Sequence, residues 1–131
     1  MLRILVVALA AVFFSTSASY ARDWVRLGDR HVGFISDHDT IHVGVQDGRF
    51  KRLKLGIHGN DIKLDSVKIL FGNGEIENVV FDQRIPDGGS AVINLRTAWH
   101  EGRFIRDVEL HYRSRPDFRG EAVAELWGQE D

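Results

Sequence analysis

Apolar and polar residues alternate along most of the chain beyond residue 40. Such alternation places every second side chain on one face of an extended segment and is typical of a half-buried strand. No stretch beyond residue 21 keeps apolar residues at the i, i+3, i+4 and i+7 positions of an amphipathic helix for long. The pattern therefore predicts strands, and the clearest segments are 41–45, 53–57, 67–71, 79–81, 91–95, 108–112 and 122–126.

Glycine, asparagine and aspartate separate these segments, and they favour the backbone angles of tight turns. We expect turns at 28–29, 47–48, 59–61, 72–74, 87–89, 101–102 and 116–120. Strands with one apolar face must bury that face against a second layer. We therefore predict an all-β fold, an antiparallel two-sheet sandwich of jelly-roll-like form, with about eight or nine strands.

The turn at 47–48 predicts a local hairpin between residues 40–45 and 50–57. Matching the apolar faces of the two strands pairs Val43 with Leu53. The register of a hairpin also determines which polar side chains lie opposite each other at its open end, where a metal site could form.

This hairpin register places His38 opposite His58. Cross-strand Cβ atoms lie about 5 Å apart, so both imidazoles could bind one divalent metal ion. Asp39, or else Asp37 or Asp61, could add an oxygen ligand. The alternative is a solvated strand end without metal, since the spacing does not match a closed zinc motif.

The run Asp37-His38-Asp39-Thr40 also resembles the first motif of haloacid-dehalogenase-type phosphohydrolases, which pairs a nucleophilic Asp with an acid–base Asp. That chemistry requires a parallel strand followed by a helix. Here Thr40 leads directly into another alternating segment. The sequence therefore argues against a phosphohydrolase.

Two loops carry side chains suited to a ligand. Trp99, in the loop 96–104, could stack on a sugar ring or on a partner's apolar side chain, or it could cap the sandwich end. Arginines in 113–120 could bind a carboxylate or phosphate, or pair with acidic neighbours. The candidate ligand-binding residues are Trp99, His100, Arg103, Arg113, Arg115 and Arg119.

The first 21 residues have the layout of a cleaved signal peptide. One basic residue precedes an uncharged apolar run at 4–14, and Ser19 and Ala21 occupy the −3 and −1 positions of a cleavage site. That run is too short to cross a bilayer core of about 30 Å as a helix. We therefore predict a signal peptide at 1–21, a single β-sandwich domain at 22–131, and no transmembrane segment.

Composition narrows the function further. The sequence contains no cysteine, which excludes thiol catalysis, cysteine zinc sites and disulfides. The formal net charge is −2, with acidic and basic residues interspersed, so nucleic acid is not an expected partner.

Short signatures along the chain together resemble a family of small exported bacterial proteins classed as a domain of unknown function. They are Leu27-Gly28, Asp39-Thr40-Ile41, FKRLKL (50–55), DIKLDSVKILFGNG (61–74), RIPDGGSAVINL (84–95), RFIRDVELHYRS (103–114) and AVAELWG (122–128). The resemblance implies an exported, β-rich, single-domain protein. It brings no activity or catalytic residue, and the cysteines of some relatives are absent here.

The sequence favours a non-catalytic binding or interaction module of the cell envelope, in the periplasm or outside the cell, with an envelope protein or glycan as partner. A metal-binding protein or metal-dependent hydrolase using His38, His58 and a nearby Asp is the alternative. On the first reading no cofactor is expected, and on the second a divalent metal. A structural envelope protein without a small ligand is a third reading, and exposed edge strands would allow a homodimer.

Overall fold

The computed structural model describes residues 23–32, 38–44, 47–98, 102–114 and 121–130, and most of them lie in strands. Nine strands and one 3₁₀ turn are present in this part of the chain. They are β1 (Trp24–Val32), β2 (His38–His42), β3 (Arg49–Phe50), β4 (Arg52–His58), β5 (Ile62–Phe71), β6 (Ile76–Ile85), β7 (Ser90–Asn94), the 3₁₀ turn (Arg96–Ala98), β8 (Arg103–Ser114) and β9 (Ala122–Gln129).

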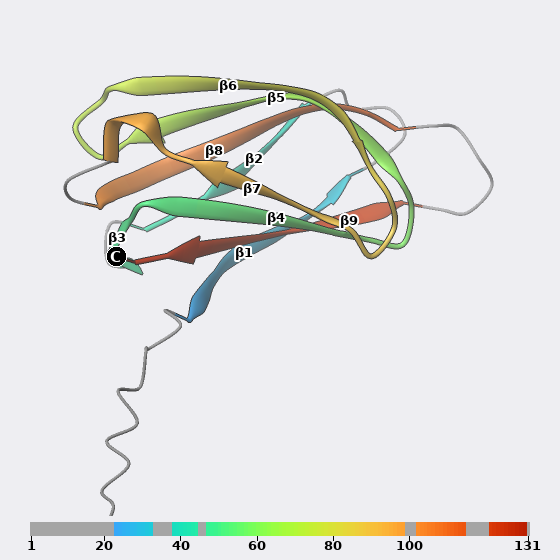
Figure 1. Ribbon diagram of the computed structural model, residues 1–131, viewed down its shortest axis with the longest axis horizontal. Coiled ribbons are helices and arrows are strands. Elements are labelled where there is room, and N and C mark those ends of the chain that lie inside the picture. The colour runs from blue at the N-terminus through green and yellow to red at the C-terminus, as the bar shows by residue number, and fades with distance from the viewer. Residues whose placement is uncertain (1–22, 33–37, 45–46, 99–101, 115–120, 131) are drawn as a thin grey trace, which may run out of the picture.

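The strands form two antiparallel layers, which Figure 1 shows one above the other. One sheet has the order β1-β9-β4-β7, and the other has the order β2-β8-β5-β6 with short β3 added to β8. First and last strands pair, as do β2 with β8, β4 with β7 and β5 with β6. These nested pairs describe one long hairpin that is folded over into two sheets, which is the topology of a jelly roll. The structure therefore confirms the predicted fold class.

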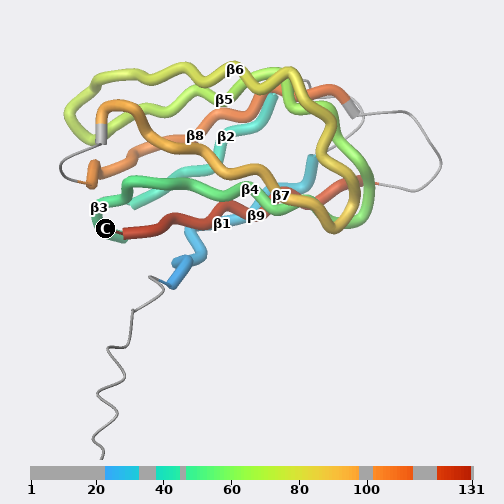
Figure 2. The backbone as a smooth tube through the Cα atoms, viewed as in Figure 1, coloured from blue at the N-terminus to red at the C-terminus, as the bar shows by residue number. Residues whose placement is uncertain are grey.

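The wrapping explains why the predicted local hairpin is wrong. β2 pairs with β8, and β4 pairs with β7 and β9, so β2 and β4 belong to different layers. Figure 2 shows the chain passing between layers from β4 to β5 and again from β6 to β7. The apolar pattern specifies which side chains face inward, but it does not specify which strand lies alongside.

The core lies between the layers and follows the alternation. Leu53, Leu55 and Ile57 of β4 point inward and are fully buried, while their neighbours along the strand point outward. Each such side chain contributes about 1.5–3 kcal/mol on burial. The twenty-two buried apolar residues of the described chain, which join in one cluster, therefore stabilise the sandwich without disulfides.

Gly28 does not form the predicted turn. It lies inside β1, where the register against β9 shifts between Arg26 and Gly28, as at a β-bulge. A Cβ at Gly28 would lie 2.9 Å from a side-chain carbon of Ile41, on the facing sheet. Glycine therefore marks a close approach between the layers here.

Candidate functional site

The structure positions only some of the predicted ligand-binding residues. Trp99, His100, Arg115 and Arg119 lie outside the described residues. Arg113 is described at the end of β8, where its side chain is 75% exposed and its Nε lies 3.3 Å from a carboxylate oxygen of Asp65. Arg113 is therefore accessible to solvent, and Asp65 is its acidic neighbour.

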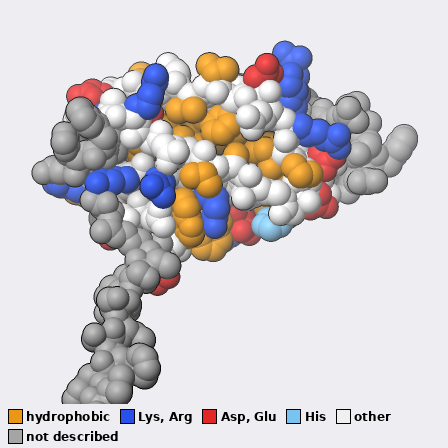
Figure 3. Space-filling model, in the orientation of Figure 1, with side chains coloured by type: hydrophobic (Ala, Val, Ile, Leu, Met, Phe, Trp, Pro, Cys, Tyr) orange, Lys and Arg blue, Asp and Glu red, His pale blue; other side chains and the backbone are white. Residues whose placement is uncertain are grey.

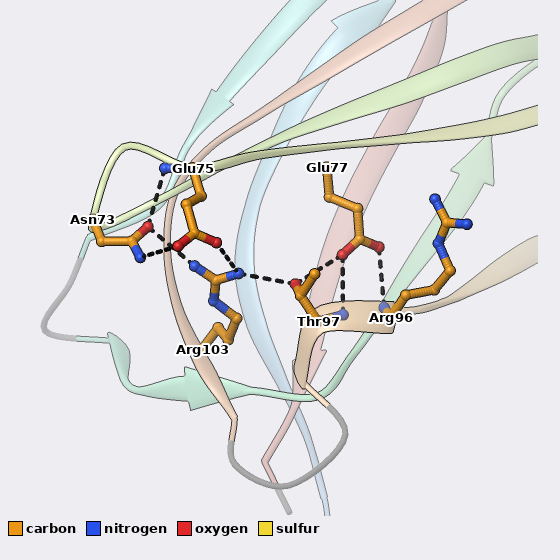
Figure 4. Close-up of polar contacts among 6 residues, drawn as sticks. All are labelled: Asn73, Glu75, Glu77, Arg96, Thr97 and Arg103. Carbon is orange, nitrogen blue, oxygen red and sulfur yellow. Dashed lines mark hydrogen bonds and ion pairs between the residues drawn. The ribbon is translucent and has the colours of Figure 1, made fainter.

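Arg103 is surrounded by protein groups at one end of the sandwich (Figure 4). Its guanidinium donates to Thr97 Oγ1 at 2.9 Å and to Asn73 Oδ1 at 3.0 Å. It also forms a 2.9 Å ion pair with Glu75 and lies over the Phe71 ring. With its side chain only 15% exposed, Arg103 is positioned to tie the β5–β6 turn to the segment after β7.

Glu77 completes this polar cluster and was not singled out from the sequence. It is 5% exposed, and its carboxylate accepts hydrogen bonds from the backbone N–H groups of Arg96 and Thr97 and from Thr97 Oγ1. Glu77 belongs to β6 in one sheet, whereas the 3₁₀ turn follows β7 in the other. The carboxylate therefore joins the two layers where their edges meet. In the sequence, Glu77 occupies an inward position of an alternating strand, and this is the one feature of the sequence that could have predicted a buried carboxylate.

The predicted pairing of His38 with His58 is wrong because the two histidines belong to different sheets. His38 lies opposite His111, while His58 lies opposite Val123. His58 instead approaches Glu125, with 3.5 Å between Nε2 and the nearer carboxylate oxygen.

Asp39 faces the inside of the sandwich. Its carboxylate accepts a 2.5 Å hydrogen bond from the hydroxyl of Tyr112, whose ring is buried in the core. Asp39 and His38 therefore point to opposite sides of β2. Among the described residues, no three His, Asp or Glu side chains are grouped so as to hold a metal ion.

The outer face of the four-stranded sheet carries an unexpected group of aromatic and cationic side chains. Strand register places Arg26, Trp127, Lys54 and Val92 in one row across β1, β9, β4 and β7. Trp24 begins the adjacent row. We call these five residues the aromatic face.

Lys54 connects the two indoles of the aromatic face. Its ammonium lies 4.8 Å from the ring centroid of Trp24 and 5.6 Å from that of Trp127. Cation–π contacts within about 6 Å are attractive, so Lys54 fixes both rings on the sheet. Both indoles are partly exposed, and Val92 is 48% exposed.

Polar side chains border the aromatic face on both sides along the strands. The row that begins with Trp24 continues through Gln129, Arg52 and Asn94. On the other side, Glu125 lies 3.8 Å from Arg26. Aromatic rings surrounded by planar hydrogen-bonding groups form a surface suited to an amphipathic ligand.

A second exposed apolar region lies along the β6 and β7 edges. Figure 3 shows apolar side chains in the middle of this view, with charged side chains around them. Outside the aromatic face, the exposed apolar residues of these strands include Ile76 and Val80, while Phe81 and Ala91 are half-buried against the core. Trp24 and Trp127 both lie on the aromatic face and not in this region, so the aromatic face is the stronger candidate site.

Comparison with known proteins supports the fold and the family. A solved structure of Pseudomonas aeruginosa AlgX matches with a TM-score of 0.52 and 16% sequence identity, over 85% of this chain and 27% of that chain. The likeness shows a shared fold, and the chain corresponds to little more than a quarter of that protein. No curated protein sequence matches significantly.

No helix within the described ranges is long and apolar enough to cross a membrane. The family comparison agrees with the resemblance already seen in the short signatures. The model for the family described as a domain of unknown function, DUF2541, matches residues 4–128, and the chain therefore belongs to that family.

Proposed function

We propose that this chain is an exported, non-catalytic binding module that holds a glycan on its aromatic face. The observation that carries the proposal is the joint placement of Trp24 and Trp127 on one outward surface, with Lys54 between them. Residues from both ends of the sequence meet there because β1 pairs with β9.

Sugar rings have apolar C–H faces and polar edges, so they bind best where an aromatic ring lies beside hydrogen-bonding side chains. Trp24 and Trp127 supply the rings, while Arg52, Asn94 and Gln129 supply donors and acceptors in the neighbouring row. Both indoles are large and rigid, which lowers the entropic cost of binding.

The shape of the site favours binding over catalysis. A ligand on an open sheet face keeps water on its other side, whereas acid–base and nucleophilic chemistry gains from a water-excluded site. The cationic groups Lys54 and Arg52 also favour glycans with carboxylate or other acidic substituents.

Export is supported by the sequence, and the composition is compatible with it. Residues 1–21 have the layout of a signal peptide, and the absence of cysteine leaves the fold independent of oxidising or reducing conditions. A glycan of the cell envelope would be accessible to a protein exported in this way.

The proposal can be tested by titrating the purified protein with neutral and anionic oligosaccharides in a calorimeter. We expect Trp24→Ala and Trp127→Ala each to weaken binding about tenfold, because each removes a stacking surface worth about 1.4 kcal/mol. Val80→Ala, at a 79% exposed position of the opposite sheet, is the matched control and leaves affinity unchanged.

Circular dichroism melts must show that each variant is folded. If both tryptophan variants bind as tightly as the wild type, the aromatic face is not the site. If Trp99→Ala alone abolishes binding, the ligand is held by the 96–104 loop instead.

A further inference from the structure

Two histidines lie side by side on the outer face of the other sheet. His38 of β2 is directly opposite His111 of β8, and their ring centroids are 5.9 Å apart with planes inclined at 24°. Both side chains reach the surface, and His111 is 41% exposed. The antiparallel backbone fixes the distance between their Cα atoms.

The spacing of the two rings matches a shared metal ion. With metal–nitrogen bonds of about 2.1 Å, each ring centroid lies about 3.2 Å from the ion, so the two centroids are about 5.2–6.4 Å apart for tetrahedral or wider angles. The observed 5.9 Å falls in this range. The rings are nearly parallel, so rotation about χ2 is needed to direct one nitrogen of each toward a common point.

Glu109 supplies a second feature of histidine metal sites. Its Oε1 lies 2.8 Å from Nε2 of His111. A carboxylate beside one ring nitrogen favours the proton on that nitrogen and leaves the lone pair on Nδ1, and such carboxylate–histidine pairs commonly orient metal ligands.

We propose that His38 and His111 form a surface site for a divalent transition-metal ion, with water completing the coordination. Because no third His, Asp or Glu in the described chain is placed to join them, the site has two protein ligands. Two imidazoles favour Cu²⁺ over Zn²⁺ in the usual order of affinities. This site is independent of the aromatic face, which lies on the opposite sheet.

Neighbouring charges modulate this site without blocking it. Lys68 of β5 is paired in register with Glu109, and Arg113 follows His111 on the same face and is paired with Asp65. Lys68 and Arg113 repel a bound metal cation, whereas the carboxylate of Glu109 attracts it. The balance predicts modest affinity that falls as acidity rises, because protons compete with the metal ion for the imidazole nitrogens.

The test is calorimetric titration of tag-free protein with Cu²⁺ and with Zn²⁺. We expect His38→Ala and His111→Ala each to weaken Cu²⁺ binding at least tenfold. His42→Ala is the matched control, since His42 lies on the same face of β2 but is 73% exposed and paired with Asp107. It should bind like the wild type.

Two further measurements make the outcome decisive. Electron paramagnetic resonance of the Cu²⁺ complex should show two coordinated imidazoles, reduced to one in His111→Gln, which tests the site if the alanine variant does not fold. Lowering the pH from 7.5 to 5.5 should weaken binding, because protons compete with the metal ion for the imidazole nitrogens. Wild-type binding that persists in both histidine variants would overturn the proposal, as would binding lost in His42→Ala.

Discussion

At the scale of single residues, the stability of the fold depends in part on a few buried polar groups that are hydrogen-bonded. Glu77 is the clearest case, because its nearly buried carboxylate accepts three hydrogen bonds from the segment that follows β7. A buried carboxylate is costly to desolvate unless its oxygens are satisfied. Here the acceptors and donors match, so the contact holds the two layers together at one end.

Glu77→Gln should lower the free energy of unfolding by about 1–3 kcal/mol. Both carboxylate oxygens accept hydrogen bonds, and in glutamine one of them is replaced by an NH₂ group, which would face an N–H donor of the 3₁₀ turn. Urea denaturation followed by circular dichroism measures this loss. The control is Glu75→Gln, whose 62% exposed side chain forms an ion pair with Arg103 and should cost about 1 kcal/mol or less. Equal losses in the two variants would contradict a special role for Glu77.

At the scale of elements, inward and outward positions of one sheet differ in whether they tolerate an added side chain. Gly128 of β9 faces the core, where an added Cβ would lie 2.6 Å from the ring of Phe50. Gly56 of the adjacent β4 faces outward, and an added Cβ there would meet its nearest neighbour at 3.9 Å. The two glycines therefore serve different purposes within the same sheet.

Gly128→Ala should destabilise the fold by about 1–3 kcal/mol, because Phe50 is fully buried and cannot move away without strain. Gly56→Ala should change stability by no more than about 0.5 kcal/mol or improve it slightly. Thermal melts of the two variants and the wild type give the comparison. A neutral Gly128→Ala variant would show that the Phe50 packing is adaptable.

The sequence predicted where the strands lie along the chain better than it predicted which strands pair. Alternation identified the inward faces of β4, β5, β8 and β9, because burial dictates that pattern. It did not reveal β1 (Trp24–Val32), an edge strand with a bulge, whose exposed residues break the alternation. It also mispaired β2 with β4, because in a jelly roll consecutive strands often enter opposite layers.

The candidate site was harder to predict for the same reason. Trp24 and Trp127 lie near opposite ends of the chain, and only the β1–β9 register brings them to one face. Lys54 carries no local signal, since an outward lysine on a strand is ordinary. The predicted loop at 96–104 favours Trp99 as a ligand-binding residue, and Trp99 lies outside the described residues.

At the scale of the whole molecule, the edge strands determine which surfaces are free to bind a partner. β6 is an edge of its sheet, and a bulge there leaves Asp82 with a positive φ of 45° and an ion pair to Lys63. Bulges and charges on an edge oppose pairing with a second chain. The two outer sheet faces are therefore the more favourable surfaces for recognition.

The proposed export predicts a defined mature protein. Expressed from its full gene in a bacterial host, the chain should be recovered from the envelope fraction with Arg22 as its first residue. Intact mass spectrometry and N-terminal sequencing check this directly. Recovery of the uncut 131-residue chain in the cytoplasm would contradict export.

The most direct test of the central claim is a nuclear magnetic resonance titration that follows the indole N–H signals of the three tryptophans. Single Trp→Phe variants assign the signals, and neutral and anionic oligosaccharides serve as probes. We predict that the signals of Trp24 and Trp127 shift together and saturate with one dissociation constant, while that of Trp99 stays in place. Unchanged Trp24 and Trp127 signals at saturating oligosaccharide would contradict glycan binding by the aromatic face.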